Sequence, residues 1–202
     1  MSDKTIRGKI RETDLAYAAG GIDADGSISI CRVFYTKEVK EKNRYKSPRY
    51  VLEVTYTNTY EEIVDWYAMT FGGSWAGKTK IDRIGMKAKM TNGRIIVGKQ
   101  LTYQWKITSK KALEFLKVTL PYYIGKKRQA ELAVEFQSNI LNRTFVSTTK
   151  IENNGKRVGM VLSPEEIAKR DWYHTTVMQL NKHLVSPATT KRGNTVTETV
   201  KR

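Results

Sequence analysis

The stretch Ala18-Ala19-Gly20-Gly21-Ile22-Asp23-Ala24-Asp25-Gly26, followed by the run SISICRVFY from Ser27 to Tyr35, decides how the chain begins to fold. Residues 14–24 are small and apolar, which predicts a helix that Asp14 caps and that Gly26 ends in a left-handed conformation. The alternation in the second run predicts a strand with one buried face. A helix therefore passes directly into a strand, with two carboxylates at the junction.

The predicted helix is poor in bulk, which is unfavourable for filling a core. Ala16, Gly20 and Ala24 are small residues four apart, and this spacing lets two helices approach closely, so we expect contact with the same helix of a second subunit. Exposed acidic residues at a helix C-terminus cost about 0.3–1 kcal/mol each, which favours a cation near Asp23 and Asp25. A plain structural cap is the alternative. A calcium loop is excluded because it needs glycine at its sixth position.

Alternation and capping signals predict the remaining elements. They comprise a strand over 49–57, a helix over 60–71 capped by Thr59 and stopped at Gly72-Gly73, strands within 74–90 and 94–107 joined at Asn92-Gly93, and helices over 110–119, 126–141 and 164–184, the last capped by Ser163. The order predicts an α+β fold with one antiparallel sheet, covered by helices on one face and open on the other. We expect an N-terminal arm (1–13), a core (14–146), a C-terminal helical extension (147–185) and a flexible basic tail (186–202).

The chain has 202 residues with 36 Lys and Arg against 20 Asp and Glu, a net charge of +16. This excess predicts a polyanionic partner, nucleic acid ahead of a membrane surface, although charge kept for solubility is the alternative. Basic residues gather within 37–49 and 78–94, with tyrosine and tryptophan between them. One cysteine excludes an intramolecular disulfide, and two histidines argue against a histidine metal site. Without an apolar leader or membrane span, we expect an intracellular protein.

The stretch from Ala18 to Gly26 resembles the nine-residue motif of the LAGLIDADG homing endonucleases. Ala19, Gly20 and the residues from Ile22 to Gly26 match, whereas Ala18 and Gly21 stand where the family's name sequence has leucine. Residues 54–73, 103–120 and 121–137 are also similar to that family. The resemblance covers about residues 14–140 and implies an αββαββα fold whose antiparallel sheet forms a DNA-binding saddle.

That family cleaves both strands of duplex DNA with divalent metals, normally Mg²⁺, and leaves 3′ overhangs. One motif per chain implies a homodimer. The interface residues implied by the motif are Ala16, Ala19, Gly20 and Asp23. By motif match Asp25 is a metal ligand and the Ala24 carbonyl a second one, and Mn²⁺ or Ca²⁺ can occupy the same sites.

Two further residues match catalytic positions of the family. Lys126 matches a basic residue near the cleavage centre, which would polarise solvent or neutralise charge at the phosphate. Asn58 matches a polar residue that orders water near the metal. A helix-start lysine and a turn residue are the alternative interpretations of these two positions.

Period-two counting from Asp25 predicts the face that contacts DNA. The predicted contacts are Ser27, Ser29, Cys31, Val33 and Tyr35 in the first strand, Arg49, Val51, Glu53 and Thr55 in the second, Thr102, Gln104 and Lys106 in the last, and Lys78, Lys80, Lys87 and Lys89 from a stretch with ambiguous alternation. A strand of ~10 residues covers about 10 base pairs, so two subunits would bind a pseudo-palindrome of roughly 20 base pairs.

The sequence thus predicts a site-specific DNA endonuclease encoded within an intron. Two alternatives stay open: an RNA maturase that assists splicing, with intron RNA as partner, and a non-cleaving regulator that binds DNA. Retention of Asp25 favours cleavage, and the lack of an added helix-turn-helix module argues against a regulator.

Overall fold

The computed structural model describes residues 10–33, 47–73, 78–82, 84–89, 95–97, 99–141, 147–151 and 157–185. Its elements are α1 (Glu12–Asp25), β1 (Gly26–Val33), β2 (Arg49–Asn58), α3 (Glu61–Phe71), β3 (Lys78–Ile81), β4 (Lys87–Lys89), β5 (Ile95–Val97), β6 (Thr102–Thr108), α4 (Ser109–Thr119), the 3₁₀ helix η1 (Leu120–Tyr122), α5 (Lys127–Leu141), β7 (Ser147–Ile151), β8 (Arg157–Leu162) and α6 (Pro164–Val185). Tyr35, the Asn92-Gly93 turn, residues 1–9, most of the 37–49 cluster and the 186–202 tail lie outside the described residues.

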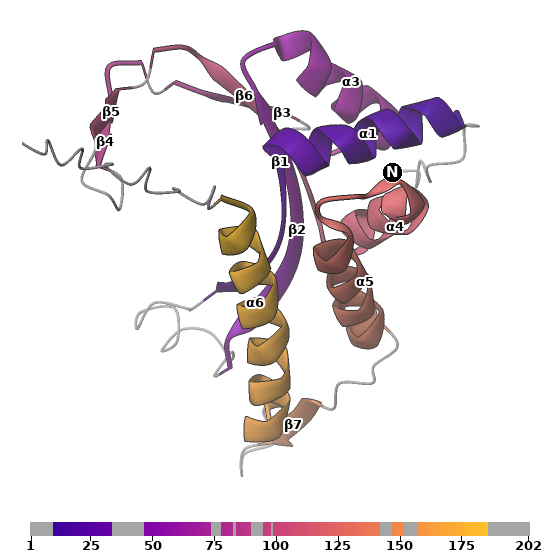
Figure 1. Cartoon of the computed structure of the whole chain (residues 1–202). Helices are drawn as coiled ribbons and strands as arrows, with labels where there is room; N and C mark the ends of the chain where they lie inside the picture. The colour runs from indigo at the N-terminus through magenta and orange to yellow at the C-terminus, as the bar shows by residue number, and fades with distance from the viewer. Residues whose placement is uncertain are drawn as a thin grey trace, which may run out of the picture.

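A four-stranded sheet in the order β1-β2-β6-β3 forms the centre of the molecule, and each neighbouring pair is antiparallel. In Figure 1, α1 lies across the upper part of β1 and β2, α4 and α5 lie to one side of these strands, and the β4–β5 hairpin projects away on the other. The predicted α+β class with helices packed on one face of an antiparallel sheet is therefore confirmed.

The core lies between the sheet and the helices. Buried residues of β1, β2 and β6, including Ile28, Val54 and Trp105, pack against buried residues of α1, α3, α4 and α5. Trp105 is fully buried, and its indole N–H donates to the carbonyl of Gly72 at 2.6 Å. The apolar alternation that predicted the strands thus corresponds to one buried face.

The α1–β1 junction differs in detail from the prediction. Gly26 has φ −91° and ψ 178°, an extended conformation, and the backbone N–H of Gly26 bonds to the carbonyl of Ile22. A glycine is needed here for space, because a Cβ would lie 2.7 Å from the Ile22 Cα and 2.9 Å from the carbonyl oxygen of Thr55. Asp14 does not cap the helix, since α1 begins at Glu12 and Asp14 pairs with Arg11 at 2.9 Å.

The start of α3 also differs from its predicted cap. Tyr60, not Thr59, precedes the helix, and the Tyr60 backbone N–H donates to Oδ1 of Asn58 at 3.0 Å. An asparagine side chain that accepts from the backbone two residues later forms a turn of its own, and this turn replaces the predicted capping box. At the other end the predicted stop is confirmed, because α3 ends at Phe71 and Gly72 takes a left-handed φ of 71°.

The two strands predicted within 74–90 and 94–107 are each divided. β3 and β6 belong to the main sheet, whereas β4 and β5 pair with each other in a separate two-stranded sheet. The segment 147–185 is also not purely helical, because β7 and β8 form a hairpin before α6. β7 has polar threonines and a register shift between Thr149 and Ile151, and neither feature produces a clear strand pattern in the sequence.

Helix α6 packs against the edge strand β1, alongside α5. Nδ1 of His174 lies 2.5 Å from the carbonyl oxygen of Ile30, and Nδ2 of Asn181 donates to the carbonyl of Ile28 at 2.9 Å. These side chains satisfy carbonyls at the edge of β1, and covering an edge strand prevents unwanted pairing. The Ser163 cap is confirmed, since its Oγ accepts from the Glu166 N–H at 3.2 Å.

None of the helices in the described ranges combines the length and the apolar character that crossing a membrane requires.

Candidate active site

The C-terminal end of α1 and the N-terminal end of α5 meet at Asp23 and Lys126. The Asp23 carboxylate accepts three backbone N–H bonds, from Ile124 at 2.8 Å, Gly125 at 3.0 Å and Lys126 at 2.8 Å. In return, Nζ of Lys126 donates to the carbonyls of Ile22 at 2.7 Å and Asp23 at 2.5 Å. Each residue therefore binds the unpaired backbone groups at the end of the other's helix.

This exchange also compensates the helix dipoles. A cation at the C-terminus of α1 and an anion at the N-terminus of α5 are both stabilising, by about 0.3–1 kcal/mol each at exposed sites and more when partly buried. Lys126 is only 8% exposed. Burial lowers the pKa of the Lys126 ammonium, and the negative charges of Asp23 and Asp25 oppose that shift. Asp23 thus supports the helix ends, as expected from its motif position.

Asp25 is the last residue of α1, and its side chain is exposed where the helix passes into β1. Nζ of Lys126 binds the carbonyls of Ile22 and Asp23, the two residues directly before Ala24. An exposed carboxylate beside a helix-terminal carbonyl provides oxygen ligands, which Mg²⁺ prefers. In the described ranges no group of three or more His, Cys, Asp or Glu side chains could hold a metal ion, so one protomer offers a sparse site.

Asn58 lies at the end of β2. Both the nitrogen and the oxygen of its side-chain amide form hydrogen bonds within the chain. Nδ2 donates to the Tyr56 hydroxyl at 2.9 Å, and Oδ1 accepts the Tyr60 N–H. Burial raises the pKa of Tyr56, and the charge of Asp25 acts in the same direction. The structure therefore brings Asp25, Lys126 and the Tyr56–Asn58 pair into one region. Tyr56 was not among the predicted site residues; its register position opposite Gly26 locates it here.

The sheet face away from α1, α3, α4 and α5 is polar. Ser27, Ser29, Cys31 and Val33 pair in register with Thr55, Glu53, Val51 and Arg49, and Thr55 pairs with Lys106. All of these alternate with buried neighbours such as Ile28 and Leu52. Nζ of Lys106 lies 2.5 Å from Glu53, and Gln104 donates to the Thr57 hydroxyl at 3.2 Å. Thr57 shares this face but was not among the predicted contacts; it continues the same alternation.

Two pairs of predicted lysines lie elsewhere. Register pairs Lys78 with Trp105 and Lys80 with Tyr103, which are positions of the helix-covered face. Since alternate residues of a strand point to opposite faces, β3 offers Thr79 and Ile81 at register positions on the polar face instead. Lys87 and Lys89 belong to the separate β4–β5 hairpin, where Lys87 is exposed. By register, Lys78 and Lys80 therefore stand at positions of the helix-covered face, and Lys87 and Lys89 belong to a hairpin outside the main sheet; that these lysines contact DNA stays a prediction.

The solved structures most similar to this arrangement include the homing endonuclease I-CvuI. Its complex with the I-CreI target in the presence of 2 mM Mg, in which the DNA is not cleaved, has a TM-score of 0.52 at 16% identity over 84% of this chain and 82% of that chain. Its complex with its own target in the presence of 2 mM Ca has a TM-score of 0.52 at 18% identity over 83% and 82%. The chain has the fold of the LAGLIDADG homing endonucleases.

No protein-family model and no curated protein matches the sequence. At identities of 16–18% the similarity concerns the homing endonuclease fold, and the role of each residue has to follow from its own geometry.

The outer side of α1 in this homing endonuclease fold carries small residues. Ala16, Gly20 and Ala24 are exposed, and a Cβ on Gly20 would meet nothing within 4 Å. Ala19 has 0% exposure and packs in the core of its own protomer, so the prediction that it lies at a subunit interface was wrong. The physical reason is the helical period, which turns Ala19 inward with Ile22 while Ala16 and Gly20 face outward.

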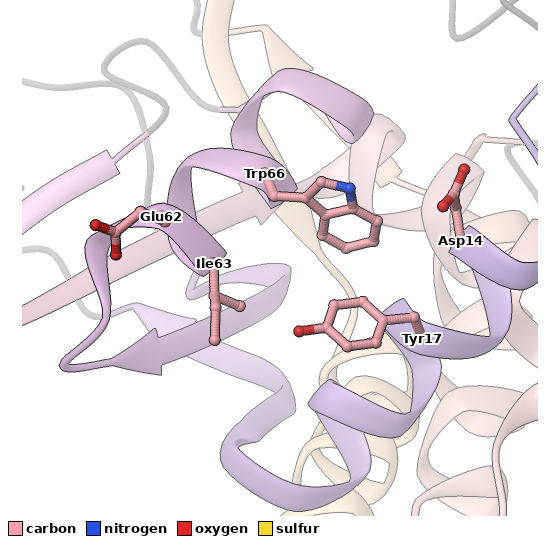
Figure 2. A pocket seen from close by; sticks show the side chains of 5 residues that line it. All are labelled: Asp14, Tyr17, Glu62, Ile63 and Trp66. Carbon is pink, nitrogen blue, oxygen red and sulfur yellow. The ribbon is translucent and has the colours of Figure 1, made fainter.

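A cavity of about 340 Å³ lies beside this outer side, between α1 and α3. Figure 2 shows the ring of Tyr17 turned toward Trp66, with the carboxylates of Asp14 and Glu62 on opposite sides of them. The two rings form an edge-to-face pair with centroids 5.0 Å apart. This surface therefore combines aromatic rings with negative charge, whereas the chain as a whole is strongly basic.

Proposed function

We propose that the chain is a site-specific homing endonuclease that hydrolyses both strands of a DNA target with the help of a divalent metal ion. The proposed target is a pseudo-palindrome of roughly 20 base pairs, bound by a homodimer, since a sheet strand of ~10 residues spans about 10 base pairs. The products would carry 3′ overhangs, and the gene would lie within an intron.

The observation that carries this proposal is the position of Asp25. An exposed carboxylate ends α1 at the point where the polar face of the sheet begins with Ser27. DNA lying on that face would bring its phosphates to the end of α1, where a carboxylate without a metal would repel them. The overall charge of +16 favours DNA binding, and the acids at this one point favour metal-dependent cleavage.

The residues present fit Mg²⁺. This ion binds proteins through one or two carboxylates and completes its coordination with phosphate oxygens and water. Asp25 and the Ala24 carbonyl are the groups that would hold it, with Mn²⁺ or Ca²⁺ as substitutes. When bound, the metal activates water for attack on the phosphate and stabilises the departing oxygen.

The protein's own part in the reaction is to fix geometry and charge. Lys126 anchors the end of α1 through two carbonyls, which opposes fraying of the helix terminus from which Asp25 projects. The buried Lys126 ammonium would also add a positive charge at the end of α1, where electrostatic interactions with the phosphate are stronger than in water. Residues of the sheet face would contact bases in the major groove, which a two-stranded β-ribbon can enter.

A cleavage selection tests the proposal. The full chain is incubated with Mg²⁺ and a library of DNA duplexes with randomised centres, and cut ends are ligated to an adaptor and sequenced. We expect one two-fold symmetric family of cut sites with 3′ overhangs, lost in EDTA. If bound duplexes are recovered uncut, the chain is a DNA-binding regulator; if only RNA is bound, the maturase alternative holds.

The homodimer is tested separately by light scattering of the chain with and without a selected duplex. We expect two protomers per duplex. A single protomer on each cleaved duplex would contradict the two-fold arrangement.

A further inference from the structure

Glu53 carries the one negative charge at the described strand positions of the polar sheet face. The other positions of that face hold serine, threonine, glutamine, cysteine and aliphatic side chains, with Arg49 and Lys106 as its basic residues. A carboxylate on a face proposed to meet DNA phosphates opposes binding unless it makes a contact of its own. The partner that Glu53 has on this face indicates what that contact can be.

Lys106 reaches Glu53 diagonally across the β2–β6 ladder. In register, Glu53 stands opposite Thr108 on β6, and Lys106 lies on the same face of that strand, one turn of the alternation away. Nζ of Lys106 lies 2.5 Å from Oε2 of Glu53, while 40% of the lysine side chain and 19% of the glutamate side chain are exposed. Ion pairs at a surface contribute little to stability, so stability alone gives weak reason for this acid.

The Glu53–Lys106 pair stands among shorter side chains. Ser29 on β1 lies opposite Glu53. Thr55 on β2 lies opposite Lys106. A β-ribbon in the major groove brings the side chains of one face to the edges of the bases. Glutamate and lysine extend farther than serine and threonine, so the pair offers the longest polar reach in this part of the face.

An acceptor held beside a donor is the complement of the major-groove edge of a G·C base pair. There cytosine presents its N4 amino donor next to the O6 acceptor of guanine, and guanine adds N7 as a second acceptor. Carboxylates accept from cytosine N4, and lysine donates to guanine O6 and N7. An A·T pair places its N6 donor between two acceptors, so it gives an ammonium group no adjacent pair of acceptors.

We propose that Glu53 and Lys106 together read one C·G base pair in each half-site, Glu53 at the cytosine and Lys106 at its guanine. Their contact with each other holds both side chains side by side before DNA binds, which lowers the cost of ordering them. Ser29, opposite Glu53, is three residues beyond Gly26, so the base pair lies about 10 Å, or about three base pairs, from the strand end that adjoins α1. This inference rests on the proposed function, because it takes the polar face as the DNA-binding face.

Selection of bound duplexes in Ca²⁺ tests the inference without turnover. The wild type, Glu53→Gln, Lys106→Met and the double variant Glu53→Lys/Lys106→Glu each select from duplexes with randomised centres, and the recovered DNA is sequenced. We expect the wild type to prefer C·G by about tenfold at one position of each half-site, and each single variant to lose most of that preference. The double variant exchanges acceptor and donor, so it should prefer G·C at that position.

The exposed ion pair of Lys110 and Glu114 on α4 supplies the matched control. The same exchange there, Lys110→Glu/Glu114→Lys, should leave the selected sequence unchanged. Circular dichroism and thermal melting check folding, and if the Glu53→Lys/Lys106→Glu variant does not fold, the two single variants decide.

The inference is overturned if the folded double variant, or both single variants, select the same base pair as the wild type, because the ion pair then serves the sheet alone. A wild-type sequence without a C·G pair at this distance from its centre overturns it as well. Recovered duplexes that share no sequence at all would contradict the proposed function itself, and this inference with it.

Discussion

Asp23, in the last turn of α1, and Lys126, directly before α5, each bind backbone groups at the end of the other residue's helix. The carboxylate of Asp23 accepts the N–H groups of residues 124–126 just before α5, and Nζ of Lys126 donates to the carbonyls of Ile22 and Asp23 at the end of α1. Asp25 follows directly on this joint. The rigidity of the candidate active site therefore depends on two residues that need not touch DNA or metal.

Replacing Asp23 should destabilise the fold more than replacing an ordinary turn carboxylate. Asp23→Ala leaves three N–H groups without their acceptor, and we expect a loss of about 1–3 kcal/mol in the free energy of unfolding, measured with urea. Asp82→Ala is the matched control, because among the described residues Asp82 accepts a single backbone N–H, that of Ile84, on an exposed turn. Equal losses in the two variants would contradict the assigned role of Asp23.

The pH dependence of stability should reveal the burial of Lys126. Burial lowers the pKa of its ammonium in the folded state below the ordinary value of 10.5. Between the two values the unfolded chain binds more protons, so the contribution of Lys126 to the free energy of unfolding rises with pH in the window just below 10.5. Unfolding curves of wild type and Lys126→Met measured from neutral pH to pH 10.5 should differ by this rise. A difference that is constant with pH would contradict it.

Gly20 of α1 and Gly26, the first residue of β1, should respond to alanine in opposite ways. Gly26→Ala places a methyl group against Ile22 and the Thr55 carbonyl, and such overpacking typically destabilises by about 1–3 kcal/mol. Gly20→Ala meets nothing within 4 Å and should stabilise the isolated protomer by up to about 1 kcal/mol. Thermal melting of both variants at low protein concentration measures the contrast. Destabilisation of the protomer by Gly20→Ala would show that the space beside Gly20 is occupied within one chain.

The contact between α6 and β1 should contribute to stability and not to cleavage. Asp171 lies 3.1 Å from Arg32 and accepts the Tyr50 hydroxyl at 2.7 Å, so Asp171→Asn removes the charge from a partly buried pair. We expect a loss of about 1–3 kcal/mol in unfolding free energy with an unchanged cleavage rate at saturating DNA. Glu165→Gln, on the first turn of α6, is the control for charge. A slower cleavage step in folded Asp171→Asn would place α6 in the reaction.

The sequence alone could predict the helix-to-strand junction, the buried face of β1 and β2 and the closeness of Asp25 to the sheet, because each follows from periodicity within one segment. It could not divide the 74–90 and 94–107 segments correctly. β4 alternates lysine with alanine and β5 is a short apolar run, and whether such strands join the main sheet depends on pairing that no local pattern specifies.

The finer roles in the candidate site also depended on tertiary contacts. No pattern showed that the Asn58 amide is bound by Tyr56 and Tyr60; that it orders water near the metal stays a prediction. Nor did a pattern show that the Lys126 ammonium is buried against α1; its role at the phosphate stays a prediction. Ala19 matched the family motif, but the helix turns it into the core. In each instance the residue type was informative, but the contacts that the residue makes follow from the folded structure and not from the sequence pattern.

Strand cleavage by Asp25→Asn, measured beside DNA binding, tests the central claim most directly. With a duplex recovered from the selection, the variant should bind within the same concentration range as the wild type in Ca²⁺ and should release no cut product in Mg²⁺. Glu114→Gln, which removes an exposed carboxylate on α4, should cut at the wild-type rate. Cleavage by Asp25→Asn at the wild-type rate, or loss of binding without loss of cleavage in the bound fraction, would contradict the account.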